Sequence, residues 1–124
     1  MKQLGKATLL LVAMMLVVGT TRAAGRPATL KGYVIDSACA FVKNLKKPIS
    51  FECAVACAKA GSPLVILGDD GVIYWPISAE VPAAGQNQRL IPLAGQRVTV
   101  SGRVYQKGGS HAIVIDKVES AAKL

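Results

Sequence analysis

Hydrophobic and polar residues follow three different patterns along this chain. Residues 7–18 form a nearly unbroken apolar run, and residues 51–60 form a short segment rich in alanine. Residues 97–106 alternate instead, with valines and a glycine on one face and polar or tyrosine side chains on the other. Strict alternation is typical of a half-buried strand, whereas an alanine-rich segment favours a helix. After residue 62 the signals are those of strands and turns, so we expect a mainly β domain.

Five segments have the composition and flanking turn residues of short strands. These predicted strands cover residues 29–36, 64–67, 72–75, 97–106 and 112–118. The sequence Gly-Asp-Asp-Gly at 68–71 predicts a hairpin turn, and Gly32 predicts a bulge or a sharp bend within the first strand. Residues 76–92 contain three prolines and predict a long irregular connection with room for one helical turn.

Between the first two strands the sequence predicts an exposed basic loop followed by one helix. Residues 37–49 carry several lysines and Pro48, which suits the loop. Ser50 has the position of an N-cap, and Gly61 has the position of a C-terminal stop. We therefore expect one helix of about ten residues over 51–60.

These elements predict a small five-stranded antiparallel barrel of the OB type, with a β-sandwich as the alternative. The domain would span residues 29–120, after a mobile linker at 24–28. The short helix, which carries cysteines, would be an insertion after the first strand. An ordinary OB fold instead places its helix between the third and fourth strands, so this helix would form an additional cap on the barrel.

Composition and charge explain the first apolar run. The chain of 124 residues is 52% hydrophobic and only 5% aromatic, which excludes a disordered, collagen-like or multidomain protein. Residues 7–18 are too few for a membrane-spanning helix, which needs roughly 20. The run follows Lys2 and Lys6 and is followed by small residues up to Ala23, which predicts a signal peptide over residues 1–23.

Removal of this peptide would give a periplasmic or secreted protein without a stable membrane span. The formal net charge would fall from +8 to +5, because Lys2, Lys6 and Arg22 leave with the signal peptide. All three cysteines would remain, and export to an oxidising compartment favours a disulfide. Three is an odd number, so at least one sulfur is free, intermolecular or bound to something else.

The spacing of the cysteines limits how they can pair. Cys39 lies three residues after Asp36, whereas Cys53 and Cys57 are four apart on the predicted helix and project from the same face. Their Cβ atoms would be about 5–6 Å apart, which is too far for a disulfide between them. Cys39 therefore pairs with one of them, or all three sulfurs converge.

Three interpretations of this arrangement remain open. One is a structural disulfide from Cys39 to Cys53 or Cys57. Another is a soft-metal site for Cu or Zn, formed by all three thiolates with Asp36 as a possible extra ligand. The last is a thiol-redox protein that uses Cys53 or Cys57, since a helix N-terminus lowers a thiol pKa.

Several motifs together resemble a group of small exported bacterial proteins that are largely uncharacterised and expected to be OB-like. The motifs are Asp36-x-x-Cys39, Cys53-Ala54-x-x-Cys57, Ala60-Gly61-x-Pro63, Tyr74-Trp75 and Leu93-x-Gly95-x-Arg97-Val98-x-Val100-x-Gly102. The resemblance spans most of residues 32–118 and implies fold and compartment rather than an activity. In that group a histidine often stands where this chain has Ser50, which favours a disulfide or a three-coordinate site here.

No arrangement of catalytic residues can be recognised, so the sequence makes no positive case for an enzyme. Arg103, Tyr105 and Tyr33 could form a surface that binds an oligosaccharide or oligonucleotide, as basic OB domains often do. Export argues against nucleic acid as the partner. The sequence therefore predicts an exported binding or accessory module, whose partner is a ligand or envelope protein that the residues do not identify.

Overall fold

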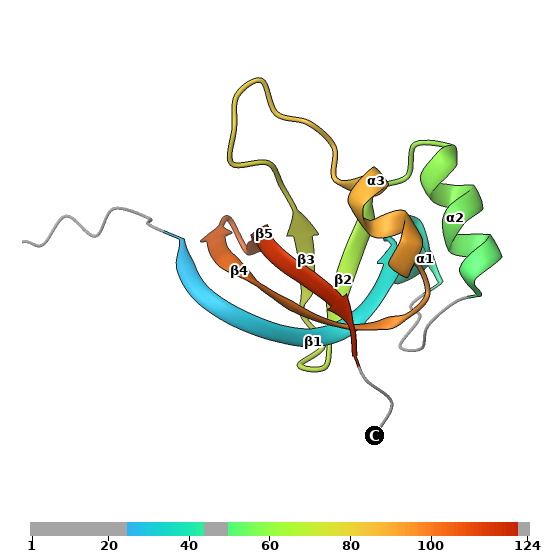
Figure 1. The fold of residues 1–124 in the computed structure, drawn as a ribbon, viewed down its shortest axis with the longest axis horizontal. Coiled ribbons are helices and arrows are strands. Elements are labelled where there is room, and N and C mark those ends of the chain that lie inside the picture. The colour runs from blue at the N-terminus through green and yellow to red at the C-terminus, as the bar shows by residue number, and fades with distance from the viewer. Residues whose placement is uncertain (1–24, 44–49, 122–124) are drawn as a thin grey trace, which may run out of the picture.

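Five strands close into a barrel in the computed structural model, which describes residues 25–43 and 50–121 (Figure 1). The predicted signal peptide lies outside the described residues. In chain order the elements are β1 (Arg26–Asp36), α1 (Ser37–Val42), α2 (Phe51–Lys59), β2 (Leu64–Gly68), β3 (Ile73–Pro76), α3 (Asn87–Leu90), the 3₁₀ helix η1 (Ile91–Leu93), β4 (Arg97–Lys107) and β5 (Ser110–Ser120).

The strand order around the barrel is β1-β2-β3-β5-β4, and β4 returns to pair with β1. Four of the five pairs are antiparallel, while β3 and β5 pair in parallel over three residues, from Tyr74 opposite His111 to Pro76 opposite Ile113. The prediction of a small five-stranded OB-like barrel is confirmed. The predicted hairpin turn at residues 68–71 also joins β2 and β3 as expected.

Gly32 lies where β1 changes partners, as its position in the first strand suggested. Residues 26–33 pair with β4, and residues 32–36 pair with β2, so both pairings overlap at Gly32 and Tyr33. A Cβ at Gly32 would collide with the carbonyl oxygen of Leu67. The strand bends strongly as it passes under the barrel (Figure 1). Glycine is therefore required here by the close approach of the neighbouring backbone.

The helices differ from the prediction in number. Residues 37–42, expected as part of the loop, form α1 because the Asp36 side chain caps the helix by accepting a hydrogen bond from the Cys39 N–H. The cysteines are therefore divided between two helices, with Cys39 in α1 and Cys53 and Cys57 in α2. The helical turn for which the sequence left room in the long connection after β3 is present as α3, at the place where an OB fold has its own helix.

The first strand also begins earlier than predicted. Arg26 pairs with Val104 and Pro27 with Arg103, so most of the predicted linker at residues 24–28 belongs to β1. The alternation that marks a strand is weak there, because Arg26 and Pro27 are exposed and Pro27 interrupts the pattern. Pairing with the long strand β4 holds these residues in a strand, which the local sequence pattern alone does not predict.

The hydrophobic core fills the barrel and continues to one of its ends. Leu90 from α3 and Ala58 from α2 contact the same cluster as Val34 and the inward side chains of the other strands. A smaller cluster lies on the outer side of β1 and β2, where Ala40 of α1 covers Ile35 and Val65. The three helices gather at this end of the barrel (Figure 1). They form the cap on which the candidate site is built.

Within the described ranges, the structure has no helix that is long and apolar enough to cross a membrane.

Candidate functional site

Asp36 is the only buried charged residue in the part of the chain that the structure describes, with none of its surface exposed. It is the last residue of β1 and lies on the same side of the strand as Val34, which faces the barrel interior. Its Oδ1 accepts a hydrogen bond of 3.0 Å from the Cys39 N–H. Its Oδ2 is buried without a hydrogen-bond partner. A buried polar atom without a partner is costly, so this oxygen marks a place where a bound group would stabilise the fold.

The three cysteines differ in their exposure. Cys39 is buried in the first turn of α1, Cys57 is partly buried in α2, and Cys53 is exposed at the start of α2. Asp36 raises the pKa values of Cys39 and Cys57, and Cys53 lies near enough to both thiols to add to these shifts. The structure thus brings together the four residues singled out from the sequence, in a cluster that runs from the buried carboxylate to the surface.

Both ends of α2 are fixed as the sequence predicted, and this sets the direction of its thiols. The Ser50 hydroxyl accepts a hydrogen bond from the Cys53 N–H at the N-cap. At the other end Gly61 has a φ of 100°, and Ser62 donates its N–H to the Cys57 carbonyl. This is the Schellman arrangement of a helix that ends at glycine. Ala54 is completely buried, so α2 rests on the barrel with the cysteine face beside it.

Asn87 holds α2 in place and was not singled out from the sequence. Its Oδ1 accepts from the Leu64 N–H, and its Nδ2 donates to the carbonyls of Ala58 and Ser62. One side chain thus joins the first residue of β2, the end of α2 and the start of α3. Nothing local distinguishes it, because amides are common in irregular connections and its three partners are 23 to 29 residues away.

Asp36 and the thiols shift one another's pKa values. Burial raises the pKa of Asp36. Hydrogen bonds lower it by more, so the pKa lies below its ordinary value; they come from the Cys39 thiol, the N–H groups of Cys39 and Ala38 and the Cys57 thiol. The carboxylate in turn raises the pKa of Cys39 to about 12, with burial adding to the effect. Burial, followed by the charge of Asp36, raises the pKa of Cys57. At neutral pH an ionised carboxylate therefore faces two protonated thiols.

The sulfur atoms do not bond to one another in the structure, where all three cysteines are free. Across residues 25–43 and 50–121, no three His, Cys, Asp or Glu side chains stand in a geometry ready to hold a metal ion. Residues that could supply ligands after side-chain rotation are Asp36, through Oδ2, and the three cysteines. The predicted alternatives of a disulfide and a metal site both remain predictions.

The residues of the other predicted surface are spread along the barrel wall, and their binding of an oligosaccharide or oligonucleotide stays a prediction. Tyr33 lies opposite Arg97 on the barrel wall, with the guanidinium 5.6 Å from the ring centre. Arg103 lies opposite Pro27, six residues further along β4. Six residues of strand correspond to about 20 Å, so Tyr33 and Arg103 do not act on one small ligand. Tyr105 lies beyond Arg103, where its ring covers Gly25.

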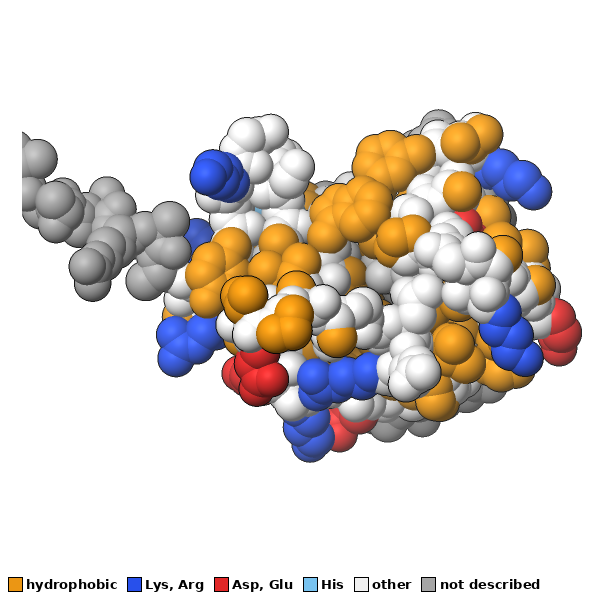
Figure 2. All heavy atoms as spheres, turned by 90° about the horizontal axis from the view of Figure 1, so that it is seen from above, with side chains coloured by type: hydrophobic (Ala, Val, Ile, Leu, Met, Phe, Trp, Pro, Cys, Tyr) orange, Lys and Arg blue, Asp and Glu red, His pale blue; other side chains and the backbone are white. Residues whose placement is uncertain are grey.

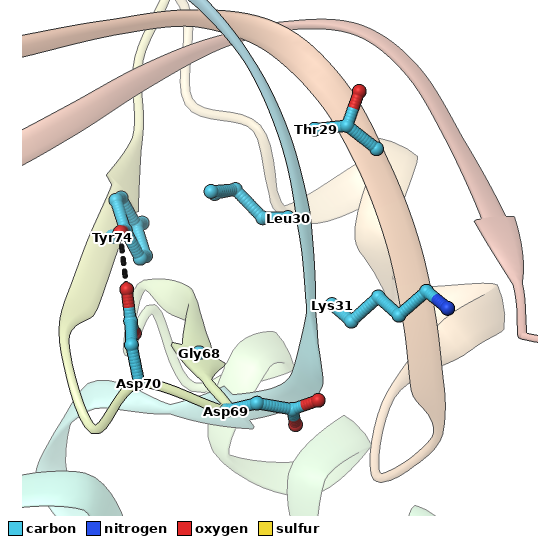
Figure 3. Close-up of a pocket in the computed structure, with 7 residues that line it drawn as sticks. All are labelled: Thr29, Leu30, Lys31, Gly68, Asp69, Asp70 and Tyr74. Carbon is cyan, nitrogen blue, oxygen red and sulfur yellow. Dashed lines mark hydrogen bonds between the residues drawn. The ribbon is translucent and has the colours of Figure 1, made fainter.

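A small hollow of about 180 Å³ lies between the middle of β1 and the β2–β3 turn (Figure 3). Both of its carboxylates already have partners. The Tyr74 hydroxyl donates to Asp70 over 2.8 Å, and Asp69 forms an ion pair with Arg97. Leu30 points to the Tyr74 side of β1, whereas Lys31 points to the other side (Figure 3). The arrangement stabilises the turn.

A larger, open hollow of about 500 Å³ lies beside the cap. Its lining combines apolar residues of β2 and β3 with backbone and amides near α3; the residues are Gly61, Pro63, Leu64, Trp75, Pro76, Ile77, Gly85, Gln86, Asn87 and Gln88. Trp75 stacks on the exposed Phe41 of α1, with ring centres 6.0 Å apart. Hydrophobic side chains are spread over the face seen from above, with basic side chains at its edges (Figure 2).

Comparison with known proteins gives no match: no protein-family model, no curated protein and no solved structure is significantly similar to this chain.

Proposed function

We propose that this chain is an exported OB-like module whose helical cap binds one metal ion, Zn or Cu, through Cys39, Cys53 and Cys57. The observation that carries the proposal is the Asp36 carboxylate, which is completely buried, has an unpartnered Oδ2 and lies against thiols. Thiolates are the ligands that Zn(II) and Cu(I) prefer.

The charge of Asp36 supports a cation as the missing partner. The pKa of this carboxyl is lowered, so the group is ionised at neutral pH. Among the described residues the ion pairs are Arg97 with Asp69 and Lys117 with Glu119, and neither involves Asp36. A buried charge is stable when it is paired or coordinates a metal. A cation beside Oδ2 would supply that partner.

The spacing within α2 also supports a shared ion. Residues four apart on a helix have Cβ atoms about 5–6 Å apart, which does not allow a disulfide on a regular helix. Two sulfurs bound to one tetrahedral Zn are about 3.8 Å apart, since each Zn–S bond is about 2.3 Å. Rotation of the Cys53 and Cys57 side chains towards each other meets that separation without unwinding the helix.

The thiol-redox alternative has less support from the same cluster. A reactive cysteine needs a lowered pKa, because the thiolate is the nucleophile. The Asp36 carboxylate and burial raise the pKa of Cys39 to about 12. Burial and the charge of Asp36 also raise the pKa of Cys57. A metal ion reverses this effect because it binds the deprotonated form of each thiol.

Titration of the reduced, metal-free protein with Zn(II) in the presence of a chromophoric chelator tests the proposal. We expect one Zn per chain, and we expect Cys39→Ser and Cys57→Ser to weaken binding by about 100-fold or more, since each removes a ligand. A matched control is Ser62→Ala, which removes a hydroxyl next to the cap but no sulfur.

Binding that is absent in the unchanged protein, or that survives both cysteine substitutions, contradicts the proposal. A protein that binds no metal and whose Cys39 forms a disulfide with Cys53 or Cys57 in air would support the structural-disulfide alternative instead. Far-UV circular dichroism of each variant shows whether a loss of binding is a loss of fold.

A further inference from the structure

We infer that the outer side of β1, β2 and β3, together with the end of α1, docks onto an anionic lipid surface. We call this surface the outer face, and it consists of apolar side chains that point away from the barrel core. They are Tyr33, Leu67, Ile73, Trp75, Phe41 and Val42. The inference does not depend on a metal ion in the cap.

Strand pairing brings the sheet part of the outer face together. Tyr33 pairs with Leu67, and Leu67 pairs with Ile73, so these side chains form one row across three strands. Trp75 follows Ile73 by two residues and therefore points to the same side of β3. All four pack against the small cluster outside the barrel, and all four are only partly buried. The sheet thus presents an apolar surface to solvent.

Helix α1 projects from this sheet and carries the most exposed part of the outer face. Ala40 is buried against the sheet, and Phe41 stacks on Trp75. Val42 follows Ala40 by two residues, which is about 200° around a helix, so its side chain points away from the sheet. Phe41 is 60% exposed and Val42 is 85% exposed. An approaching surface would meet these two side chains first.

The charges beside the outer face are mainly positive. Lys43 is the C-cap of α1, and Lys31 lies on the same side of β1 as Tyr33. Both lysines are exposed, and the ion pairs among the described residues involve neither of them. Arg97 lies over the Tyr33 ring and is paired with Asp69. The two lysines complement anionic lipid headgroups, which attract basic residues near the surface.

The chemistry of the outer face favours lipid over a sugar or a peptide. Its side chains carry few polar atoms, namely the Tyr33 hydroxyl and the Trp75 ring N–H, whereas sugars and peptides are oriented by several hydrogen bonds. Tyrosine and tryptophan are enriched where proteins meet the lipid interface, and lysines extend from there to the headgroups. Phe41 and Val42 can enter among acyl chains without a complementary pocket.

Trp75 is the only tryptophan of the chain, so its fluorescence reports on the outer face. We expect quenching by vesicles of equal parts phosphatidylglycerol and phosphatidylcholine that carry bromine on their acyl chains. Brominated vesicles of phosphatidylcholine alone should bind at least about tenfold more weakly, because they lack the charge that attracts lysines. Raising the salt from about 0.1 M to about 1 M should remove most of this difference.

Substitutions at exposed positions test the docking surface without changing the fold. We expect Val42→Ser to weaken binding to the anionic vesicles by about tenfold, through loss of buried apolar surface. Lys43→Gln should weaken it by about fivefold, through loss of one charge. Val81→Ser, at a valine that is 95% exposed in the connection after β3, is the matched control and should leave binding unchanged.

Three results would overturn the inference. One is the absence of Trp75 quenching by the anionic vesicles, or equal quenching by phosphatidylcholine alone. Another is an equal effect of Val42→Ser and Val81→Ser. The third is a change in Trp75 fluorescence with a peptide of alternating glutamate and leucine but not with vesicles, which would assign the outer face to an acidic protein partner instead.

Discussion

The place of Asp36 shows what single residues contribute to this fold. Its identity and its distance from Cys39 were visible in the sequence, and they were enough to mark it as a possible ligand. Its complete burial was not visible, because that depends on α2 packing over the end of β1. Asp36 is a helix cap and, in the proposed function, the buried charge that a bound cation would neutralise. The sequence predicted instead that the basic loop would begin at residue 37.

The unequal burial of the three cysteines predicts the order in which they react. In the folded, metal-free protein a maleimide should label the exposed Cys53 first, Cys57 next and Cys39 last. Peptide mapping after short labelling times measures the order, and urea-unfolded protein is the control in which the three rates should converge. Early labelling of Cys39 would contradict the buried position of its sulfur.

Tyr74 predicts a dependence of stability on pH. Burial and the hydrogen bond to Asp70 raise the pKa of Tyr74 above its ordinary value. The folded state thus favours the protonated phenol, so this contribution to stability is complete below about pH 10 and is lost as the pH rises through the higher pKa of the folded state. Above about pH 10 the urea midpoint should fall more steeply in the unchanged protein than in Tyr74→Phe.

Tyr105→Phe, at a tyrosine outside the hydrogen bond to Asp70, is the matched control for this measurement and should follow the unchanged protein. Identical slopes for Tyr74→Phe and the unchanged protein between pH 9 and about pH 11 would show that the phenol has no role in this dependence.

The elements of the cap were only partly predictable. The ends of α2 follow from Ser50 and Gly61, whose capping roles depend on neighbouring residues alone. The helix α1 was missed because its cap is Asp36, which also ends a strand, and because the lysines that follow suggest a loop. The helix α3 is four residues long and has no side-chain cap, so its sequence carries little helical signal.

Asn87 predicts how strongly these elements depend on one another. Asn87→Ala would leave the Leu64 N–H and the carbonyls of Ala58 and Ser62 without their partner. Partly buried groups that lose their partners cost about 1–3 kcal/mol in such cases, so we expect the free energy of unfolding to fall by about 2–3 kcal/mol. Urea unfolding measures this loss. The substitution Asn87→Ala should also weaken metal binding, because it releases α2 from the barrel.

Gln88→Ala, at the exposed neighbour of Asn87, is the control and should change the free energy of unfolding by less than about 0.5 kcal/mol. If both variants unfold alike, Asn87 does not connect the cap to the barrel.

At the scale of the whole molecule, the barrel was predicted from the number of strands and the glycine in the first one. Alternating residues identify strands without identifying their partners, and here one long strand, β1, must serve two neighbours. The parallel pairing of β3 with β5 and the early start of β1 depend on contacts between distant segments. Neither can be deduced from local patterns.

Closure of the barrel should depend on Gly32. Gly32→Ala places a methyl group against the Leu67 carbonyl, which β-sheet pairing does not allow to move freely. Overpacking of this kind costs about 1–3 kcal/mol, which a lowered urea midpoint would show. Gly85→Ala is the matched control, since its new methyl group meets open space. Equal midpoints for the two variants would contradict the close approach at Gly32.

The most direct test of the metal site is the intact mass of the protein purified from its native compartment. Native mass spectrometry, with and without alkylation under denaturing conditions, counts the bound metal and the free thiols in the same sample. The proposed function predicts one metal ion per chain and three alkylated cysteines after its removal. A chain that carries no metal and has only one alkylated cysteine contains a disulfide instead, and that result would contradict the account.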